Sequence, residues 1–545
     1  RDEQLRGNRR LTCRVYAPVG QQVELLAYLV RRLLENGANT SFVNRITDDA
    51  LDIEEVVRDP VAQARQDGWC RHPHIRLPAA LFEPDRCNSL GLDLNDADTV
   101  SRLADEFADA TRRTWRSAPV IGGELRDGDL MPVTDPVDPA RRVGSWVSAT
   151  PEDALAALDM AAGSANAWRR RCVAERADLL RGASDALEAA SAEFMYLLCR
   201  EGGRCLNDAH LEVREAVDFL RYYAFQAEQT LTADQPLPGP TGEQNTLRCL
   251  GRGAFLCISP WNFPLAIFTG QIAAALVAGN SVLAKPAEQT PLIAAAMVRL
   301  LHEAGIPGEV LHLLPGDGPT LAAPLLADAR LAGVAFTGSL QAARAIGKAL
   351  ADRAGPMVPF IAETGGVNAM IVDATALPEQ VTRDALQACE ERARQRFPVL
   401  AEASSSTLST GWFVRPVAFE VAAVADVPNE IFGPYLHVLR WRADALETLV
   451  DEINALGYGL TLSIHSRSRS RVRRVADRAR VGNVYINRNQ IGAVVGSQPF
   501  GGEGLSGTGP KAGGPNYLQR FVVEQTLSAD TTAAGGNASL LTLDA

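Results

Sequence analysis

The stretch Pro359-Phe-Ile-Ala-Glu-Thr-Gly-Gly-Val-Asn368, continued by Ala369-Met-Ile-Val-Asp373, decides the fold. Two apolar runs flank an acid and two glycines, which predicts a strand, a tight turn and a second strand. Glu363 then lies at an exposed strand end, where a carboxylate can reach a cleft. Gly365 and Gly366 let the backbone turn sharply and approach a ligand closely. Taken alone, the pattern favours an ordinary Gly-Gly turn with a solvated acid, so the neighbouring segments must decide.

The bulk composition predicts a soluble globular α/β protein. A chain of 545 residues is too long for one core, and about three or four folding units are expected. The apolar content of 46% and charged content of 22% fit that class. The net charge of −11 argues against binding to nucleic acid or anionic membranes. No membrane span is predicted. Nine cysteines without a Cys-x-x-Cys pair indicate a reducing cytoplasm and no metal site.

Four apolar runs separated by helical patterns predict a parallel, doubly wound sheet. The runs begin at Gly253, Ser281, Gly308 and Leu331. Ligands bind at the carboxyl ends of such strands, and polar residues follow the strands there. Asn262 is a neutral amide donor suited to a developing oxyanion. The polar residues at these strand ends are Asn262, Lys285, Glu288 and Ser339. Each of them alone is more simply explained as a solvated side chain, and only their order along the chain is specific.

That order resembles the aldehyde dehydrogenase superfamily. The motifs are Pro-Trp-Asn-Phe-Pro at 260–264, Lys-Pro-Ala-Glu-Gln-Thr-Pro at 285–291, Phe-Thr-Gly-Ser at 336–339 and Glu-Thr-Gly-Gly at 363–366. The resemblance implies that Asn262 supports the oxyanion and that Glu363 is the general base. It also implies a set of NAD-binding residues, which are Lys285 and Glu288 at the adenosine ribose, Phe336, Gly338 and Ser339 against the cofactor, and Glu430 and Phe432 at the nicotinamide ribose and ring.

The run from Gln498 to Pro515 resembles the glutamate-semialdehyde branch of that superfamily, in which a glycine- and serine-bearing loop anchors the substrate carboxylate. By that resemblance the substrate residues are Phe500, Ser506 and Gly507. A Gly-x-Gly-x-x-Gly match at 502–507 precedes no predicted helix and is rejected as a dinucleotide fingerprint.

The N-terminal 45 residues predict one strand and one helix. Tyr28, Arg31 and Arg32 share a helical face, where two arginines can clamp a carboxylate, although a solvated basic patch is the simpler explanation. Residues 14–43 resemble the last βα unit of the proline dehydrogenase barrel in bacterial proline utilization A. The resemblance implies that Tyr16, Tyr28, Arg31 and Arg32 held proline. One unit cannot close a barrel, so neither FAD nor proline oxidation is expected. The charged start, without Met, suggests the cut end of a longer chain.

The nucleophile of the resembled family is missing from its expected place. Aldehyde dehydrogenation needs a thiolate, which the family places about 35 residues after the general base; 34 positions after Glu363 stands Phe397. Glu430 follows Glu363 by 67 residues, roughly half of the family spacing. An internal deletion of about 60 residues near 389–410 is therefore inferred. Cys389 is a poor substitute, because the adjacent acids would raise its pKa.

These inferences predict five regions: 1–45, a proline dehydrogenase remnant; 46–95, a linker; 96–362, an NAD-binding domain; 363–495, a shortened catalytic domain; and 496–545, a substrate-anchor loop with an oligomerisation or lid tail. The expected function is NAD-dependent oxidation of L-glutamate γ-semialdehyde to glutamate, impaired by the missing thiol. The alternative is a non-catalytic remnant that binds NAD or forms a homodimer. A small-molecule substrate is expected in either an active or an impaired enzyme.

Overall fold

The computed structural model describes residues 59–66, 68–70, 75–232, 234–378, 380–381, 399–402, 411–412, 414, 416–490 and 494–530. The chain divides into two units, Arg1–Arg76 and Leu77–Ala545. The described part of the first unit contains helix α4 (Pro60–Gln66). All the elements described below belong to the second unit.

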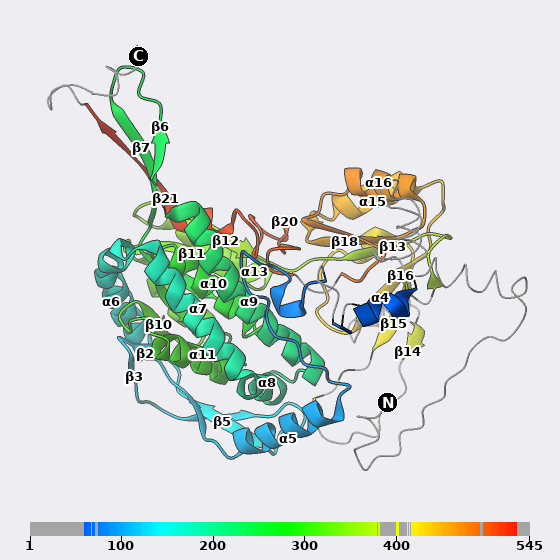
Figure 1. Cartoon of the computed structure of the whole chain (residues 1–545), viewed down its shortest axis with the longest axis horizontal. Helices are drawn as coiled ribbons and strands as arrows, with labels where there is room; N and C mark the ends of the chain where they lie inside the picture. Colours follow the sequence, from blue (N-terminus) through cyan, green and yellow to red (C-terminus); the bar gives the residue numbers. More distant parts are fainter. Residues whose placement is uncertain are drawn as a thin grey trace, which may run out of the picture. The chain divides into compact units, whose positions relative to one another are not determined.

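The second unit is built on a seven-stranded sheet (Figure 1). In sheet order its strands are β12 (Phe360–Glu363), β11 (Leu331–Thr337), β8 (Ala254–Ile258), β9 (Ser281–Lys285), β10 (Leu311–Leu313), β2 (Val120–Ile121) and β3 (Glu124–Leu125). The first five strands run parallel, and β2 and β3 complete the edge in antiparallel pairing. The predicted α/β fold is confirmed, and all four predicted apolar strands lie in this sheet.

Helices cover both faces of this sheet because its strands are apolar on both sides. In β8, Phe255 and Cys257 join one core, whereas Ala254 and Leu256 join the other. The first core is completed by α7 (Val173–Ala189), α8 (Ser191–Arg200), α9 (Leu206–Leu231), α10 (Ala266–Val277) and α11 (Pro291–Glu303). The second core is completed by α6 (Pro151–Arg170), α12 (Gly318–Ala327) and α13 (Leu340–Asp352). This arrangement leaves the ends of the parallel strands free to carry a site.

Several helices begin with a side-chain cap. Asp96 accepts a hydrogen bond from the Thr99 amide at the start of α5 (Ala97–Thr111). Thr150 and Asp153 form a capping box at the start of α6. The long helix α9 follows the short α8, and the apolar α10 is enclosed on all sides, as a helix without a polar face must be.

The two strands that flank Gly365 and Gly366 exist, but they belong to different sheets. β12 closes the large sheet, whereas β13 (Ala369–Val372) lies parallel to β18 (Thr461–His465). The turn therefore joins two layers and does not make a hairpin. The second sheet ends with β19 (Asn483–Ile486) and packs on α15 (Leu446–Ala455) and α16 (Arg469–Arg478). A third sheet contains β14 (Val399–Glu402), β15 (Val417–Val421) and β16 (Tyr435–Leu439).

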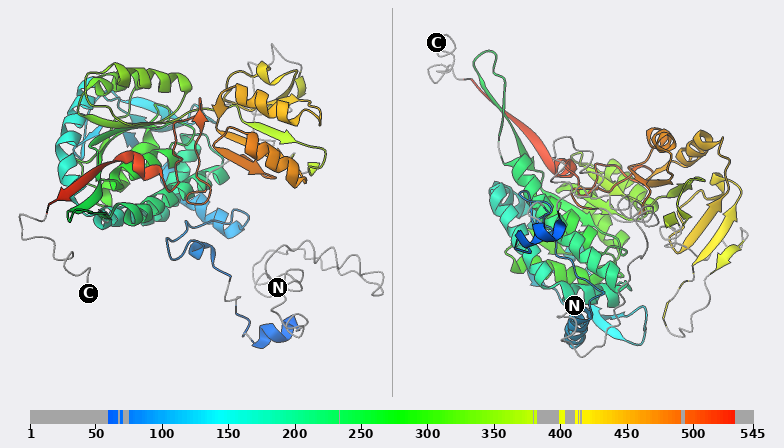
Figure 2. Two further views of the ribbon diagram at one scale, coloured as in Figure 1. Left: turned by 90° about the horizontal axis from the view of Figure 1, so that it is seen from above. Right: turned by 45° about the vertical axis from the view of Figure 1, so that its right-hand side comes forward.

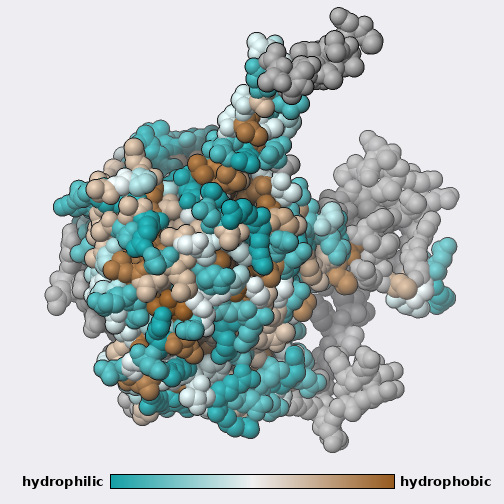
Figure 3. Space-filling view, turned by 90° about the vertical axis from the view of Figure 1, so that its left-hand side faces the viewer, coloured by the Kyte–Doolittle hydropathy of each residue, from teal (hydrophilic) through white to brown (hydrophobic). Residues whose placement is uncertain are grey.

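Three strands that were not predicted form a projecting arm. β6 (Gln235–Leu237), β7 (Gln244–Gly251) and β21 (Val522–Ala529) lie in one antiparallel sheet that extends from the α/β body (Figures 1 and 2). Figure 3 shows apolar side chains in small groups among polar ones on one face of the molecule, with one group at the base of the arm. Most residues of β21 are exposed, so the arm has little core of its own.

Smaller elements complete the second unit. They are β1 (Trp115–Ser117), β4 (Met131–Thr134), β5 (Arg142–Trp146), β17 (Tyr458–Gly459), β20 (Glu503–Gly504) and the 3-10 turns at Pro78–Ala80, Val424–Asp426 and Tyr517–Phe521. Among the described residues, no helix is both long enough and apolar enough to span a bilayer.

Candidate active site

Glu363 ends β12 and is enclosed by the glycine-rich loop at 501–508. Its Oε2 accepts a hydrogen bond of 2.9 Å from the Gly502 amide, and Gly507 forms a β-bridge with Glu363. A Cβ at Gly501 or at Gly507 would lie 2.8 Å from a Glu363 carboxylate oxygen. A Cβ at Gly507 would also lie 2.9 Å from the Gly502 carbonyl, a backbone atom that cannot rotate away, so Gly507 in particular lets the loop approach this closely.

The environment of Glu363 favours its neutral form. Burial raises the pKa of Glu363 to about 8, against the opposing effects of the Gly502 hydrogen bond and the Lys511 charge. Its Oε1 has no hydrogen-bond partner among the described atoms. A carboxyl group with a pKa near neutrality can accept and release a proton at physiological pH, as a general base must.

The turn that follows Glu363 contacts Glu430. The Gly366 amide donates a hydrogen bond of 3.3 Å to Glu430 Oε1, and a Cβ at Gly365 would lie 1.7 Å from Glu430 Oε2. Burial raises the pKa of Glu430. This contact brings together two motifs that lie 67 residues apart in the sequence.

Phe432 extends the cluster to the loop after β8. Its ring meets the ring of Trp261 edge to face at 5.3 Å between centroids. Both rings are well exposed, Trp261 at 49% and Phe432 at 61%. Exposed aromatic faces next to polar groups are suited to a planar ligand ring.

Asn262 is held in the loop after β8 by Arg204, which the sequence did not reveal. Arg204 donates a hydrogen bond to the Asn262 carbonyl, lies 4.2 Å above the Phe263 ring and pairs with Glu212 at 2.6 Å. Glu212 also accepts a hydrogen bond of 2.9 Å from the Leu265 amide, and burial raises its pKa to about 7. The sequence feature that could have revealed this contact is Glu212, an acid among the apolar residues of the buried face of helix α9.

Lys285 and Glu288 meet at the carboxyl end of β9. Lys285 Nζ donates hydrogen bonds to Glu288 Oε1 at 2.8 Å and to the Pro286 carbonyl at 3.0 Å. A Cβ at Gly318, the first residue of α12, would come within 3.6 Å of Glu288 Oε1. Lys285 is buried and offers hydrogen-bond donors, and Glu288 is partly exposed and offers acceptors. Beside a glycine at a helix start, these groups fit the two hydroxyls of a ribose.

Two of the predicted cofactor residues already have partners in the protein. Phe336 is 5% exposed and packs in the core, with its ring 6.5 Å from that of Phe360. Ser339 caps α13 by accepting a hydrogen bond from the Ala342 amide. Gly338 donates its amide to the Glu363 carbonyl at 3.1 Å and so links β11 to the candidate base.

The predicted substrate residues line the same loop in different ways. Gly507 contacts Glu363, whereas the Ser506 side chain is fully buried and accepts a hydrogen bond of 3.1 Å from the Gly459 amide. Phe500 is half-buried, and its amide pairs with the Ala512 carbonyl at 3.0 Å. The structure thus brings Gly507 to the candidate base and directs the Ser506 hydroxyl to the backbone of β17.

The remaining predicted residues, Tyr16, Tyr28, Arg31, Arg32 and Cys389, lie outside the described residues. Cys389 is the only cysteine in the sequence after Cys257. Cys257 lies inside β8, where burial raises its thiol pKa far above the usual range.

Two family profiles match the chain. The aldehyde dehydrogenase family matches residues 125–396 and 382–527, and proline dehydrogenase matches residues 2–45. Together these matches cover the two parts that the motifs had suggested.

The chain is also similar to individual proteins over most of its length. The bifunctional protein PutA of Escherichia coli is 42% identical over 594 aligned positions, which cover 95% of this chain and 44% of that protein. The 1-pyrroline-5-carboxylate dehydrogenase of Bacillus cytotoxicus is 31% identical, with 75% of this chain and 92% of that protein covered. A crystal structure of bifunctional proline utilization A aligns with a TM-score of 0.81 at 43% identity, covering 95% of this chain and 56% of that one.

The chain thus spans less than half of the length of the PutA relative, and nearly the whole of the smaller dehydrogenase. The strand ends and the Glu363 turn lie in the first aldehyde dehydrogenase segment, residues 125–396, and the glycine-rich loop lies in the second, residues 382–527. By these matches the chain belongs to the aldehyde dehydrogenase family.

Proposed function

We propose that this chain carries an NAD-binding L-glutamate γ-semialdehyde dehydrogenase module that lacks its catalytic thiol and turns over little or no substrate. The observation that carries the proposal is the contact of the Glu363 turn with Glu430, which joins the candidate base to the candidate nicotinamide site. The relatives named PutA and 1-pyrroline-5-carboxylate dehydrogenase support the choice of substrate.

The residues at the strand ends fit NAD by their chemistry. Lys285 and Glu288 would hold the adenosine ribose, and Glu430 with Phe432 would hold the nicotinamide end. NAD supplies the hydride acceptor when it is bound. Asn262 offers an amide donor to an oxyanion, and Glu363 holds or releases the proton of an attacking water. These groups can bind and orient an aldehyde, but they do not include a convincing nucleophile.

An internal deletion accounts for the missing nucleophile. The alignment with the E. coli relative spans 594 positions, more than the 545 residues of this chain, so that relative has residues that this chain lacks. The family profile matches in two segments that meet at 382–396, which supports a break in this region. We therefore keep the predicted regions 96–362 and 363–495 as a proposed cofactor domain and a proposed shortened catalytic domain.

The competing function is a non-catalytic remnant that binds NAD or forms a homodimer. We propose a cytoplasmic location from the cysteine usage, and we propose that the single βα unit in residues 1–45 does not bind FAD by itself. We also propose that this unit does not oxidise proline, because one βα unit cannot close a barrel.

The test is NADH formation at 340 nm by the purified chain with NAD and 1-pyrroline-5-carboxylate, beside a Cys389→Ala variant. We expect no signal above background from either folded protein. Activity that disappears in Cys389→Ala would overturn the proposal and make Cys389 a relocated nucleophile.

NAD binding is tested separately by thermal unfolding. A ligand raises the melting temperature only when its site is formed, so NAD should stabilise the chain and should do so less in Lys285→Met. An unchanged melting temperature at millimolar NAD would contradict the cofactor site.

A further inference from the structure

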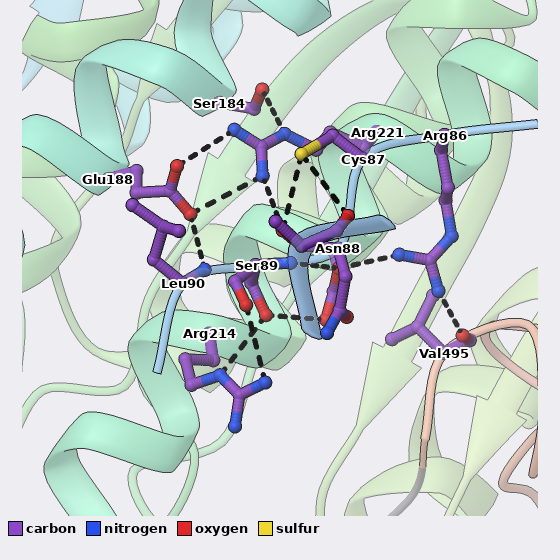
Figure 4. A network of polar contacts seen from close by, with 12 residues as sticks. Arg86, Cys87, Asn88, Ser89, Leu90, Ser184, Glu188, Arg214, Arg221 and Val495 are labelled. Atoms are coloured by element: carbon purple, nitrogen blue, oxygen red, sulfur yellow. Dashed lines mark hydrogen bonds and ion pairs between the residues drawn. The ribbon is translucent and has the colours of Figure 1, made fainter. Parts of the chain in front are cut away.

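Residues 82–92 lie along helix α9, and a polar network holds them there (Figure 4). Arg86 pairs with Asp218 at 2.6 Å, and Ser89 Oγ donates a hydrogen bond of 2.8 Å to the same carboxylate. Arg221 donates to Glu188, and the Leu90 amide donates to Glu188 Oε1 at 2.7 Å. We refer to residues 82–92 as the strap.

Among the strap side chains drawn in Figure 4, Arg86 alone reaches the segment at 494–514, which contains the glycine-rich loop. Its second guanidinium nitrogen donates a hydrogen bond of 2.7 Å to the Val495 carbonyl. Arg86 is 9% exposed, and its guanidinium lies 3.9 Å above the Phe82 ring. Both of its contacts are therefore shielded from water, where a charge-assisted hydrogen bond is strong and its loss is costly.

The contact at Val495 can affect the residues around Glu363 because hydrogen bonds join the two ends of the loop. The Gly496 amide donates to the Gly513 carbonyl at 2.9 Å, and Phe500 pairs with Ala512. The Gly513 amide in turn donates to the Tyr223 hydroxyl of α9 at 2.9 Å. Beyond these ties the chain continues directly into residues 501–508, which enclose Glu363.

The geometry points to Arg86 as a positioning residue that holds the loop at 494–514 against α9 and so keeps residues 501–508 closed around Glu363. Arg86 is thus the residue through which the strap contacts this loop, although Arg86 and Val495 lie 409 residues apart in the sequence. This inference depends on the proposed function only for the role of Glu363, since the contacts themselves do not require NAD or turnover.

The Glu363 pKa distinguishes a positioning role of Arg86 from a general effect of Arg86 on stability. Closure by the loop buries Glu363, so releasing the loop should return the Glu363 pKa toward that of a solvated carboxyl. Lys511 is the charged group that faces Glu363 in the loop, and it would move away at the same time, which opposes part of the change. The pKa is obtained from the pH dependence of stability in pairs of proteins with and without Glu363→Gln.

The test compares Arg86→Met with Arg221→Met. Arg221 is 8% exposed and belongs to the same network, but its recorded partners are Ser184, Asp185, Glu188 and Asn88, none of them in the loop. We expect Arg86→Met to lower the Glu363 pKa by about one unit or more and to speed amide hydrogen exchange at 494–514. Arg221→Met should leave both unchanged even where it lowers stability.

An unchanged Glu363 pKa in folded Arg86→Met would overturn the inference, and so would an equal decrease in Arg221→Met. If Arg86→Met does not fold, Arg86→Lys takes its place, because lysine keeps the charge beside Asp218 but lacks the second nitrogen that reaches Val495. A decrease in the Glu363 pKa in Arg86→Lys supports the inference, and no decrease overturns it. NAD binding and NADH formation are not read in this experiment, so failure here leaves the proposed function standing.

Discussion

At the scale of single residues, the raised pKa of Glu363 results from its burial by the backbone of the loop. Its neighbours on the loop side are glycines, and the nearest opposing charge, Lys511, only partly offsets the effect of burial. Burial also lowers the pKa of Lys511 itself. The pKa of Glu363 therefore depends on how closely the loop approaches the carboxyl group. A change in this pKa would show that the loop has moved.

Glu363 should make the folded state less stable as the pH rises. Its pKa is raised from the usual 4.5 to about 8 on folding, so the stability it contributes is complete below pH ~4.5 and is lost as the pH rises through about 8, with a slope of at most about 1.4 kcal/mol per unit. The difference in unfolding free energy between the wild type and Glu363→Gln, measured in urea from pH 5 to 9, isolates this effect. A pH-independent difference would contradict the shifted pKa.

Gly507→Ala should destabilise the fold as well as the site. The new Cβ would meet the Gly502 carbonyl at 2.9 Å and the Ala362 carbonyl at 3.1 Å, in addition to Glu363. Because backbone atoms cannot rotate away as a side chain can, we expect a loss of about 1–3 kcal/mol of unfolding free energy. Gly509→Ala is a poor control because Gly509 has a φ of +52°; Gly163→Ala, where the Cβ meets no atom within 4 Å, should be neutral or stabilising.

At the scale of elements, buried carboxylates fix the starts of two helices that support the site. Glu201 accepts hydrogen bonds from the Leu292 and Ile293 amides at the start of α11, at 2.7 and 2.9 Å. Glu212 does the same for Leu265 and Ala266 at the start of α10. In each case an acid from one helix satisfies amides that have no partner within their own helix.

Glu201→Ala should cost about 2–4 kcal/mol of unfolding free energy, because two buried amides lose their acceptor. Glu193→Ala in α8, the helix that Glu201 directly follows, is the matched control. Glu193 pairs with Arg113 and Arg299, both more than half exposed, so its loss should cost less than about 1 kcal/mol. Equal losses in urea denaturation would contradict the capping role of Glu201.

The sequence predicted those elements whose physics is local. The runs that became β8, β9, β10 and β11 are continuous apolar segments, as parallel strands buried on both faces must be. By contrast, Arg86, Arg204 and Glu212 act through partners 409, 58 and 53 residues away, and no local pattern encodes such pairs.

The candidate site was predictable only through its motifs. The resemblance named Glu363, Glu430 and Asn262, and the structure brings the first two together through Gly366. The structure also shows that the Ser506 hydroxyl and the Phe336 ring are occupied within the protein, which no spacing rule reveals. Side-chain direction at the end of an irregular loop depends on tertiary packing and not on sequence period.

At the scale of the whole molecule, the arm has two outer strands, β6 and β21, whose outer edges pair with no other strand of the part of the chain that the structure describes. β7 lies between β6 and β21, and exposed edges of this kind pair readily with another chain unless they are protected. Val523 and Leu527 are apolar and exposed on β21, at 41% and 52%. The arm is thus the natural surface for the proposed homodimer.

We expect a Val523→Asp and Leu527→Asp double variant to sediment as a monomer at concentrations where the unchanged chain is a dimer. Charged residues at both positions place like charges at the edge of each copy, which disfavours pairing. Sedimentation equilibrium gives the masses, and circular dichroism checks that the fold is kept. A monomeric unchanged chain, or a variant that remains dimeric, would rule out the arm as the interface.

The glycines around Glu363 also limit where a cysteine could be introduced beside this carboxyl group. A cysteine introduced at Gly501 or Gly507 would place its Cβ 2.8 Å from a Glu363 carboxylate oxygen, so it would displace the proposed base. A cysteine at either of these two positions would therefore not supply the nucleophile of the proposed dehydrogenase. Under the proposed deletion, dehydrogenase activity would instead require a complete thiol-bearing segment grafted between residues 389 and 411, with the loop left as it is.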